Sequence, residues 1–195
     1  MCSVLKNRLD HNTTTRNPPL ALITIGANIG NPVATVLRAV ERLADLSAGP
    51  ILRSSLWRTT PVDCPPGTPP FVNAAAAILP LPDETPESLL QKLLAIENEF
   101  GRTRPGHNAP RTLDLDLIAF GAETRQSANL TIPHPRAHAR RFVLQPLAEI
   151  VPAFLLPGHN ATIAELLATL PEGERIERLQ IAPAFAIAAR IVQRK

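Results

Sequence analysis

Arg111-Thr112-Leu113-Asp114-Leu115-Asp116-Leu117 is the most regular stretch of this sequence, because apolar and polar residues alternate along it. Successive side chains of a β-strand point to opposite faces. The alternation therefore predicts a strand over 112–120, with Leu113, Leu115 and Leu117 on a buried face. Asp114 and Asp116 then share the other face.

The two carboxylates predict a cation site. At a rise of about 3.3 Å per residue, two strand positions i and i+2 lie roughly 6–7 Å apart. That spacing suits hard divalent cations, and Mg²⁺ prefers oxygen ligands that it shares with water and phosphate. The alternative is a solvent-facing strand with two acids, although Asp is rare in strands and like charges on one face repel each other. The residues alone leave both interpretations open.

The segments around this stretch predict an α/β (α+β) fold of the ferredoxin-like type. Short runs rich in apolar residues predict strands over 20–25, 51–59 and 71–79. Helices are expected from Pro32, which Asn31 can cap, and from Pro86 to Gly101. The order strand–helix–strand–strand–helix–strand is that of the split βαβ arrangement, an antiparallel-rich sheet with helices packed on it. Two further helices are expected, over 142–150 and 163–170.

Length and composition predict a single domain, with 195 residues of which 45% are hydrophobic. We expect a flexible leader over 1–19, the domain over 20–170 and a C-terminal extension over 171–195. Two cysteines are too few for a disulfide framework, and no apolar run approaches the roughly 20 residues of a membrane span. The leader lacks the apolar core of a signal peptide. We therefore expect a cytoplasmic protein without membrane or nucleic-acid partners, acting as a monomer.

The placement of charge points to a polyanionic ligand. The whole chain carries a net charge of +3, yet the segment 102–141 holds seven Arg against three acids and alone carries +4. The planar guanidinium of Arg suits phosphate. The arginines that flank the Asp pair are Arg102, Arg104, Arg111, Arg136 and Arg140, whereas Arg125 and Arg141 are interpreted as surface charges.

Three other kinds of residue are candidates for ligand contacts. His134 lies between Pro133 and Pro135, so it can donate to phosphate or fill a rigid turn; a zinc pair with His138 is the weaker alternative. Asn73 places an amide in an apolar strand, where it must find hydrogen-bond partners or read a heterocycle. Phe71 and Phe142 fit a core or a stacking site.

Taken together, these segments resemble the 6-hydroxymethyl-7,8-dihydropterin pyrophosphokinase family. The matching stretches are Ile25–Gly30, Ser54–Pro61, Phe71–Ala74, Gly101–Asp116 and Leu130–Leu144. They span about residues 20–157, and the block that ends in Asp114-Leu115-Asp116 is highly specific.

The resemblance implies a transfer of pyrophosphate from ATP to the hydroxymethyl group of the pterin, with release of AMP. It implies that Asp114 and Asp116 chelate two Mg²⁺ ions and that Arg102 and Arg111 neutralise the transferred group. The implied ATP contacts are Arg104, His134 and Arg140 for the phosphates, and Glu97, Thr131 and the Leu117 backbone for the adenosine. The implied pterin contacts are Phe71, Phe142, Asn73 and the backbones of Thr59 and Val62.

The sequence departs from the family pattern at His107 and Asn108, where the family often carries Arg and sometimes Trp. A nucleotidyltransferase is a weaker reading, because Gly30 lies 84 residues before Asp114 rather than one hairpin before it. An RNA-binding module of the same fold would carry paired aromatic residues on its strands, and these strands lack them. An inactive family member is disfavoured by the intact Asp pair.

Overall fold

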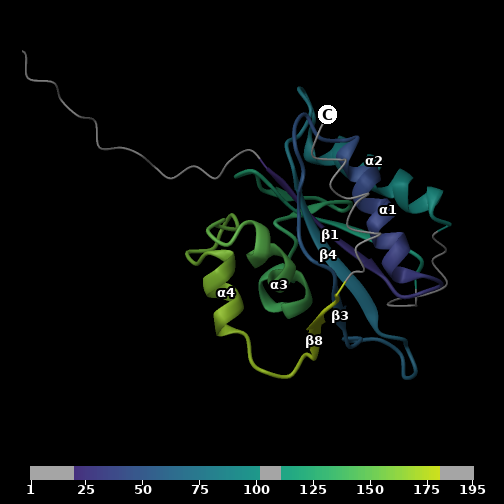
Figure 1. Cartoon of the computed structure of the whole chain (residues 1–195). Helices are drawn as coiled ribbons and strands as arrows, with labels where there is room; N and C mark the ends of the chain where they lie inside the picture. Colours follow the sequence, from purple (N-terminus) through teal and green to yellow (C-terminus); the bar gives the residue numbers. More distant parts are fainter. Residues whose placement is uncertain (1–19, 102–110, 181–195) are drawn as a thin grey trace, which may run out of the picture.

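The computed structural model describes residues 20–101 and 111–180, which form a main antiparallel sheet with helices on both faces and a separate two-stranded sheet (Figure 1). The elements are β1 (Ala21–Ala27), α1 (Pro32–Ala44), β2 (Leu52–Arg53), β3 (Trp57–Thr59), β4 (Phe71–Ile78), α2 (Pro86–Glu99), β5 (Asp114–Phe120), β6 (Arg125–Gln126), β7 (Thr131–Ile132), the 3₁₀ turn η1 (Ala137–Ala139), α3 (Arg141–Ile150), α4 (Ile163–Thr169) and β8 (Ile176–Arg178). The main sheet has the order β5-β1-β4-β3-β8, with β2 also paired to β4. Helix α1 follows the first strand and α2 precedes β5, so the predicted ferredoxin-like arrangement is confirmed.

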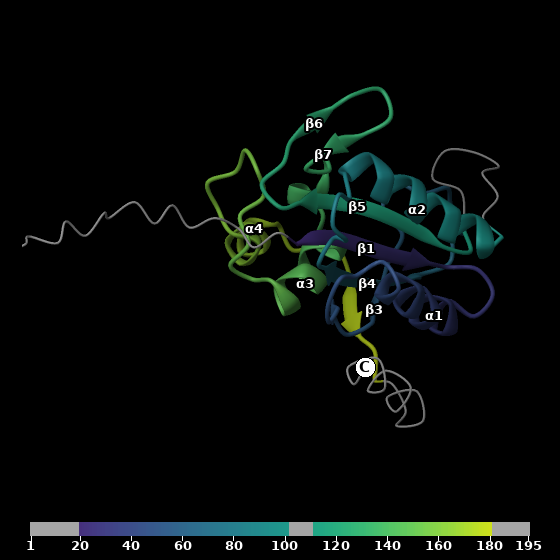
Figure 2. The ribbon, with the colours of Figure 1, turned by 90° about the horizontal axis from the view of Figure 1, so that it is seen from above.

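The sheet separates two apolar cores. Helices α1 and α2 pack on one face against β1, β4 and β5, and α3 with α4 covers the other face (Figure 2). Every residue of β1 is buried because both of its faces are covered. In β4 the four consecutive alanines Ala74–Ala77 alternate between the two cores, and their small side chains let the helices come close.

Strand β5 places the two carboxylates as the alternation predicts. Leu113, Leu115 and Leu117 are buried in the core under α1 and α2, while Asp114 and Asp116 lie partly exposed on the other face. A register shift against β1, between Leu22 and Ile23, leaves one extra residue in β5. This bulge ends the alternation just past Asp116, so the strand turns apolar side chains to both cores beyond that point.

Local capping explains where the two long helices begin. The Asn31 side chain accepts a hydrogen bond from the Ala34 N–H at 3.1 Å, as predicted for the start of α1. Helix α2 begins with a capping box between Thr85 and Ser88, in addition to the predicted Pro86. Across residues 20–101 and 111–180, no helix is long and apolar enough to cross a membrane.

The prediction of one strand over 51–59 is wrong. The segment forms two short strands, because the Ser54 hydroxyl accepts a hydrogen bond from the Ala75 N–H at 2.9 Å and itself donates to the Ser55 carbonyl. A side chain thus takes a bond that the strand backbone would otherwise make. Strand β8 was also not predicted; it lies in the expected extension 171–195 and pairs with β3 at the edge of the sheet.

Candidate active site

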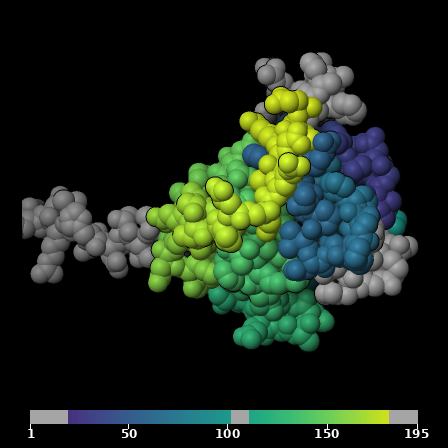
Figure 3. All heavy atoms as spheres, turned by 90° about the horizontal axis from the view of Figure 1, so that it is seen from below, coloured from purple at the N-terminus to yellow at the C-terminus, as the bar shows by residue number. Residues whose placement is uncertain are grey.

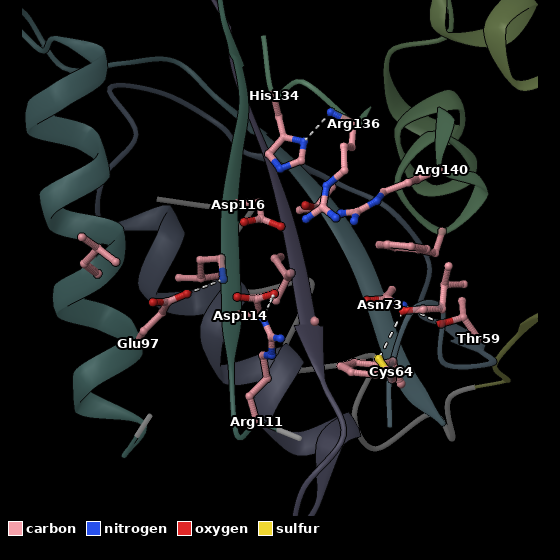
Figure 4. A pocket seen from close by; sticks show the side chains of 18 of the residues that line it. Thr59, Cys64, Asn73, Glu97, Arg111, Asp114, Asp116, His134, Arg136 and Arg140 are labelled. Carbon is pink, nitrogen blue, oxygen red and sulfur yellow. Dashed lines mark hydrogen bonds and ion pairs between the residues drawn. The ribbon is translucent and has the colours of Figure 1, made fainter. Parts of the chain in front are cut away.

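A cavity of about 690 Å³ opens over the middle of the sheet (Figure 4). Its walls come from β1, β4 and β5, from one side of α2, from the loop after β3 and from the segment between β7 and α3. The predicted site residues that line it are Thr59, Val62, Phe71, Asn73, Glu97, Arg111, Asp114, Asp116, His134, Arg140 and Phe142. Side chains from distant parts of the sequence therefore meet in one cavity.

The remaining predicted site residues lie elsewhere. Leu117 and Thr131 do not line the cavity: the Leu117 side chain is buried in the core, and Thr131 is exposed on β7. Their predicted adenosine contacts stay predictions. Arg102 and Arg104 lie outside the described residues, as do the departures at His107 and Asn108.

The Asp pair sits in the centre of the cavity beside Arg111. The Arg111 guanidinium donates a hydrogen bond to Asp114 at 2.7 Å, and the Arg111 backbone is tied to the buried side chain of Asn28 at 2.8 Å. Burial, together with the negative charges of Asp114 and Glu97, raises the pKa of Asp116 to about 7. The site thus concentrates negative charge at a place where little solvent screens it.

Glu97 connects helix α2 to the strand that carries the Asp pair. Its side chain is 1% exposed, and Oε1 accepts a hydrogen bond from the Leu115 N–H at 2.7 Å. Because Leu115 lies between the two aspartates in the chain, this hydrogen bond fixes the position of the Asp pair relative to α2. The Leu115 N–H points away from β1, towards the outer edge of the sheet. The backbone N–H and C=O of Leu117, two residues later, face the same edge.

The donor set fits Mg²⁺ better than zinc. In residues 20–101 and 111–180 no three His, Cys, Asp or Glu side chains gather to hold a metal ion. Two aspartates alone provide hard oxygen ligands and leave the remaining positions of an octahedral shell to water or phosphate, which is how Mg²⁺ usually binds. The zinc pair of His134 and His138 is not formed, since the His138 ring lies against His159 with centroids 4.9 Å apart.

Cations gather at one end of the cavity, above Asp116 in Figure 4. Burial, together with the positive charges of Arg140 and Arg136, lowers the pKa of His134 to about 4, so its imidazole is neutral at physiological pH. Its Nδ1 accepts the Arg136 N–H at 3.3 Å, which places the ring proton on Nε2. Burial and the Arg136 charge also lower the pKa of Arg140. These groups form an anion-binding set.

Another part of the cavity, the amide end, carries an amide and two aromatic side chains. Asn73 donates a hydrogen bond to the Thr59 hydroxyl at 2.7 Å and retains one N–H and its carbonyl oxygen. Phe71 and Phe142, both half-buried, line the same cavity, and the Arg140 guanidinium lies 5.4 Å from the centre of the Phe142 ring. This end suits a flat, polar-edged ring.

Several lining residues were missed by sequence reasoning. Leu90 and Leu94 of α2 were not among the predicted site residues, yet both are half-buried and line the cavity together with Gln91. Their i, i+4 spacing on a face separate from the buried Leu89 and Leu93 was the available signal. Cys64 and Asn129 come from loops, where no periodicity could mark them.

Comparisons with known proteins identify relatives of this chain. The family model described as "7,8-dihydro-6-hydroxymethylpterin-pyrophosphokinase (HPPK)" matches residues 22–152. A 2-amino-4-hydroxy-6-hydroxymethyldihydropteridine pyrophosphokinase of Synechocystis sp. is 40% identical over 147 residues, covering 75% of this chain and 74% of the relative. The same-named protein of Haemophilus influenzae is 37% identical over 158 residues, covering 80% and 96%.

Solved structures show the same fold. Wild-type Plasmodium falciparum HPPK-DHPS with pteroate superposes with a TM-score of 0.59 at 15% identity, covering 76% of this chain and 42% of that one. This chain therefore spans less than half the length of that solved chain. Since the family model covers most of the chain, from the second residue of β1 through β7 and all of α3, the chain belongs to the HPPK family of pyrophosphokinases.

Proposed function

We propose that the protein transfers pyrophosphate from ATP to 6-hydroxymethyl-7,8-dihydropterin, giving the pterin diphosphate and AMP in folate biosynthesis. One observation carries the proposal: a single cavity brings together a carboxylate pair, a cluster of cations, and an amide with two Phe side chains. A triphosphate needs the first two features, and a pterin needs the third.

ATP would occupy the cation end of the cavity. The Nε2–H of His134 and the guanidinium of Arg140 are donors for phosphate oxygens, and charge-assisted bonds of this kind contribute roughly 1.5–3 kcal/mol each. Leu90 and Leu94 offer the adenine an apolar wall next to Glu97. The Leu117 backbone and Thr131 would add adenosine contacts, since Leu117 follows the lining residue Asp116 and Thr131 lies two residues after the lining residue Asn129. Arg104 would add a further phosphate contact.

The pterin would occupy the amide end. A flat ring stacked between Phe71 and Phe142 gains about 1–3 kcal/mol per face, by analogy with stacked nucleobases. Asn73 has both a donor and an acceptor left for the polar edge of the heterocycle, and the backbones of Thr59 and Val62 extend that edge.

The chain supplies positioning and charge rather than a covalent partner. When bound by Asp114 and Asp116, two Mg²⁺ ions would neutralise the triphosphate and polarise its oxygens. Arg111, held against Asp114, and Arg102 would neutralise charge on the transferred group. Holding both reactants in line can account for about 7–11 kcal/mol of the barrier, so no strong base is required of the protein.

The direct test measures AMP formation from ATP and Mg²⁺, with and without the pterin. We expect AMP to form only when the pterin is present. Pterin-independent AMP, or binding of neither ligand in calorimetry, would contradict the proposal. Binding of both ligands without AMP would contradict the transfer step alone.

Chelation tests the metal part of the proposal. We expect EDTA to stop pterin-dependent AMP formation and excess Mg²⁺ to restore it, because two carboxylates without a metal repel the triphosphate. The measurement is the initial rate across a Mg²⁺ titration in EDTA-treated protein. A rate that is indifferent to chelation would remove the metal from the mechanism.

Gly26→Ala should weaken pterin binding. An added Cβ at Gly26 would lie 2.9 Å from Asn73 Oδ1, so the amide must move. Losing the hydrogen bonds of one polar group raises KM for the pterin about tenfold. Gly49→Ala is the matched control, since its Cβ would meet Leu79 at the same 2.9 Å but away from the cavity. Equal KM changes in the two variants would contradict the assignment of Asn73.

A further inference from the structure

We propose that Glu174 is a positioning residue for the pterin end of the cavity, acting through the first turn of helix α3. The proposal rests on the proposed function, because it takes the pterin to be the ring that Phe142 contacts. Glu174 lies beyond residues 22–152, the part of the chain that the family model covers.

Glu174 supplies a cap that the local sequence of α3 lacks. The N-cap residue Arg140 makes no side-chain cap bond, and the first turn of α3 holds no acidic residue. The Glu174 Oε2 instead accepts the Phe142 N–H at 3.1 Å. A carboxylate at this end of a helix both pairs a backbone donor and opposes the positive end of the helix dipole.

A second contact joins the same turn to the chain just before Glu174. The Arg141 guanidinium, interpreted from the sequence as a surface charge, donates to the Leu170 carbonyl at 2.9 Å and to the Pro171 carbonyl at 3.4 Å. The first turn of α3 is therefore held on two sides by residues 170–174. Phe142 and Arg140 belong to this turn, and both line the cavity.

The chain that follows Glu174 holds the opposite wall. The Thr60 N–H donates to the Arg175 carbonyl at 3.1 Å, and β8 pairs with β3, placing Ile176 opposite Thr59. Figure 3 shows this yellow segment lying between the green helices and the blue β3–β4 region. Residues 170–178 thus connect the side of the cavity that contains Phe142 to the side that contains Thr59. The Glu174 side chain makes the contact with the α3 backbone.

Glu174 is less exposed than the two acidic residues near it in the chain. Glu174 is half-buried, whereas Glu172 and Glu177 are exposed, and Glu177 pairs with Arg58 at 3.8 Å on the edge of the sheet. The Glu174 carboxylate also attracts the guanidinium of Arg140. Asp116 and Asp63 attract the same guanidinium, and Arg136 repels it. Removal of Glu174 is therefore expected to loosen Phe142, whose N–H loses its acceptor, while Arg140 keeps the attraction of Asp116 and Asp63 and the Asp pair is untouched.

The test compares Glu174→Ala, Glu174→Gln and the control Glu172→Ala in the full chain. Loss of a helix cap of ordinary strength predicts that Glu174→Ala raises KM for the pterin about fivefold. We expect kcat and KM for ATP to stay within about twofold. Glu174→Gln keeps an oxygen that accepts the Phe142 N–H and should recover most of the pterin affinity. Glu172→Ala should match the wild type.

Amide hydrogen exchange provides a readout that is independent of the pterin. The Phe142 amide should exchange about fivefold faster in Glu174→Ala and near the wild-type rate in Glu174→Gln. Unchanged exchange at Phe142 in Glu174→Ala would overturn the proposal, as would equal KM increases for pterin and ATP. If wild-type protein made no AMP, the proposed function would fail, while faster exchange at Phe142 would still support the positioning of α3 by Glu174.

Discussion

Asp116→Asn is expected to abolish pyrophosphoryl transfer and, in Mg²⁺-free buffer, to make the protein more stable. Removing one of the two carboxylates removes a metal contact worth several kcal/mol in the transition state, so kcat should fall by at least about 10³-fold. Burial and the charges of Asp114 and Glu97 disfavour the ionised form of Asp116 in the folded protein. A neutral amide of the same shape relieves that unfavourable charge.

The sign of the stability change follows from the pKa of Asp116. The folded value of about 7 lies above the ordinary value of 3.8, so between these pH values the folded protein binds more protons than the unfolded chain. The free energy of unfolding that this group contributes is present below about pH 4 and is lost as pH rises towards 7. Metal-free Asp116→Asn should lack this loss, and each 1 kcal/mol gained raises Tm by about 2–4 °C.

Two measurements on one variant check this prediction: the rate of AMP formation and the pH dependence of Tm in EDTA. Asp83→Asn serves as the control, because Asp83 is exposed, lies outside the cavity and has a φ of 63° that Asn readily adopts. Retained activity in Asp116→Asn would refute the metal assignment. A lower Tm at pH 7 would show that the carboxylate serves the fold rather than the site.

Periodicity explains how much of this architecture the sequence could reveal. The alternation in β5 assigned Leu115 to the core and Asp114 and Asp116 to the opposite face, because a strand allows only two faces. The spacing of apolar residues likewise located α1 and α2, with Asn31 and Pro32 marking a start. These features depend on residues near one another in the chain.

Features that depend on distant partners were out of reach. The interruption at Ser54 requires the Ala75 N–H, which lies 21 residues away. The bulge in β5 requires the register of β1, and β8 pairs with β3 although its sequence has no marked alternation. The roles of Leu90 and Leu94 could not be separated from those of the core residues Leu89 and Leu93, because apolar spacing on a helix does not tell a core face from a cavity wall. These features become visible only in the folded structure, where the distant partners meet.

Asn73→Ala is expected to weaken pterin binding by about 10- to 100-fold and to leave ATP binding nearly unchanged. The amide sits in β4 beside Gly26, and its bond to Thr59 fixes which way it faces. The alanine variant loses the contacts with the heterocycle and leaves the buried Thr59 hydroxyl without this partner. An unsatisfied buried polar group costs about 1–3 kcal/mol.

Calorimetry with each ligand separately distinguishes this effect from a loss of fold. Asn129→Ala is the matched control, since Asn129 also lines the cavity but comes from the loop between β6 and β7 and is exposed. We expect that control to bind the pterin like the wild type. Equal losses of pterin and ATP affinity in Asn73→Ala would mean that the amide supports the sheet rather than the ligand. A loss confined to the pterin assigns the amide end of the cavity to the acceptor substrate. Ionised phosphate oxygens only accept hydrogen bonds, so ATP phosphates would not need the amide's carbonyl oxygen.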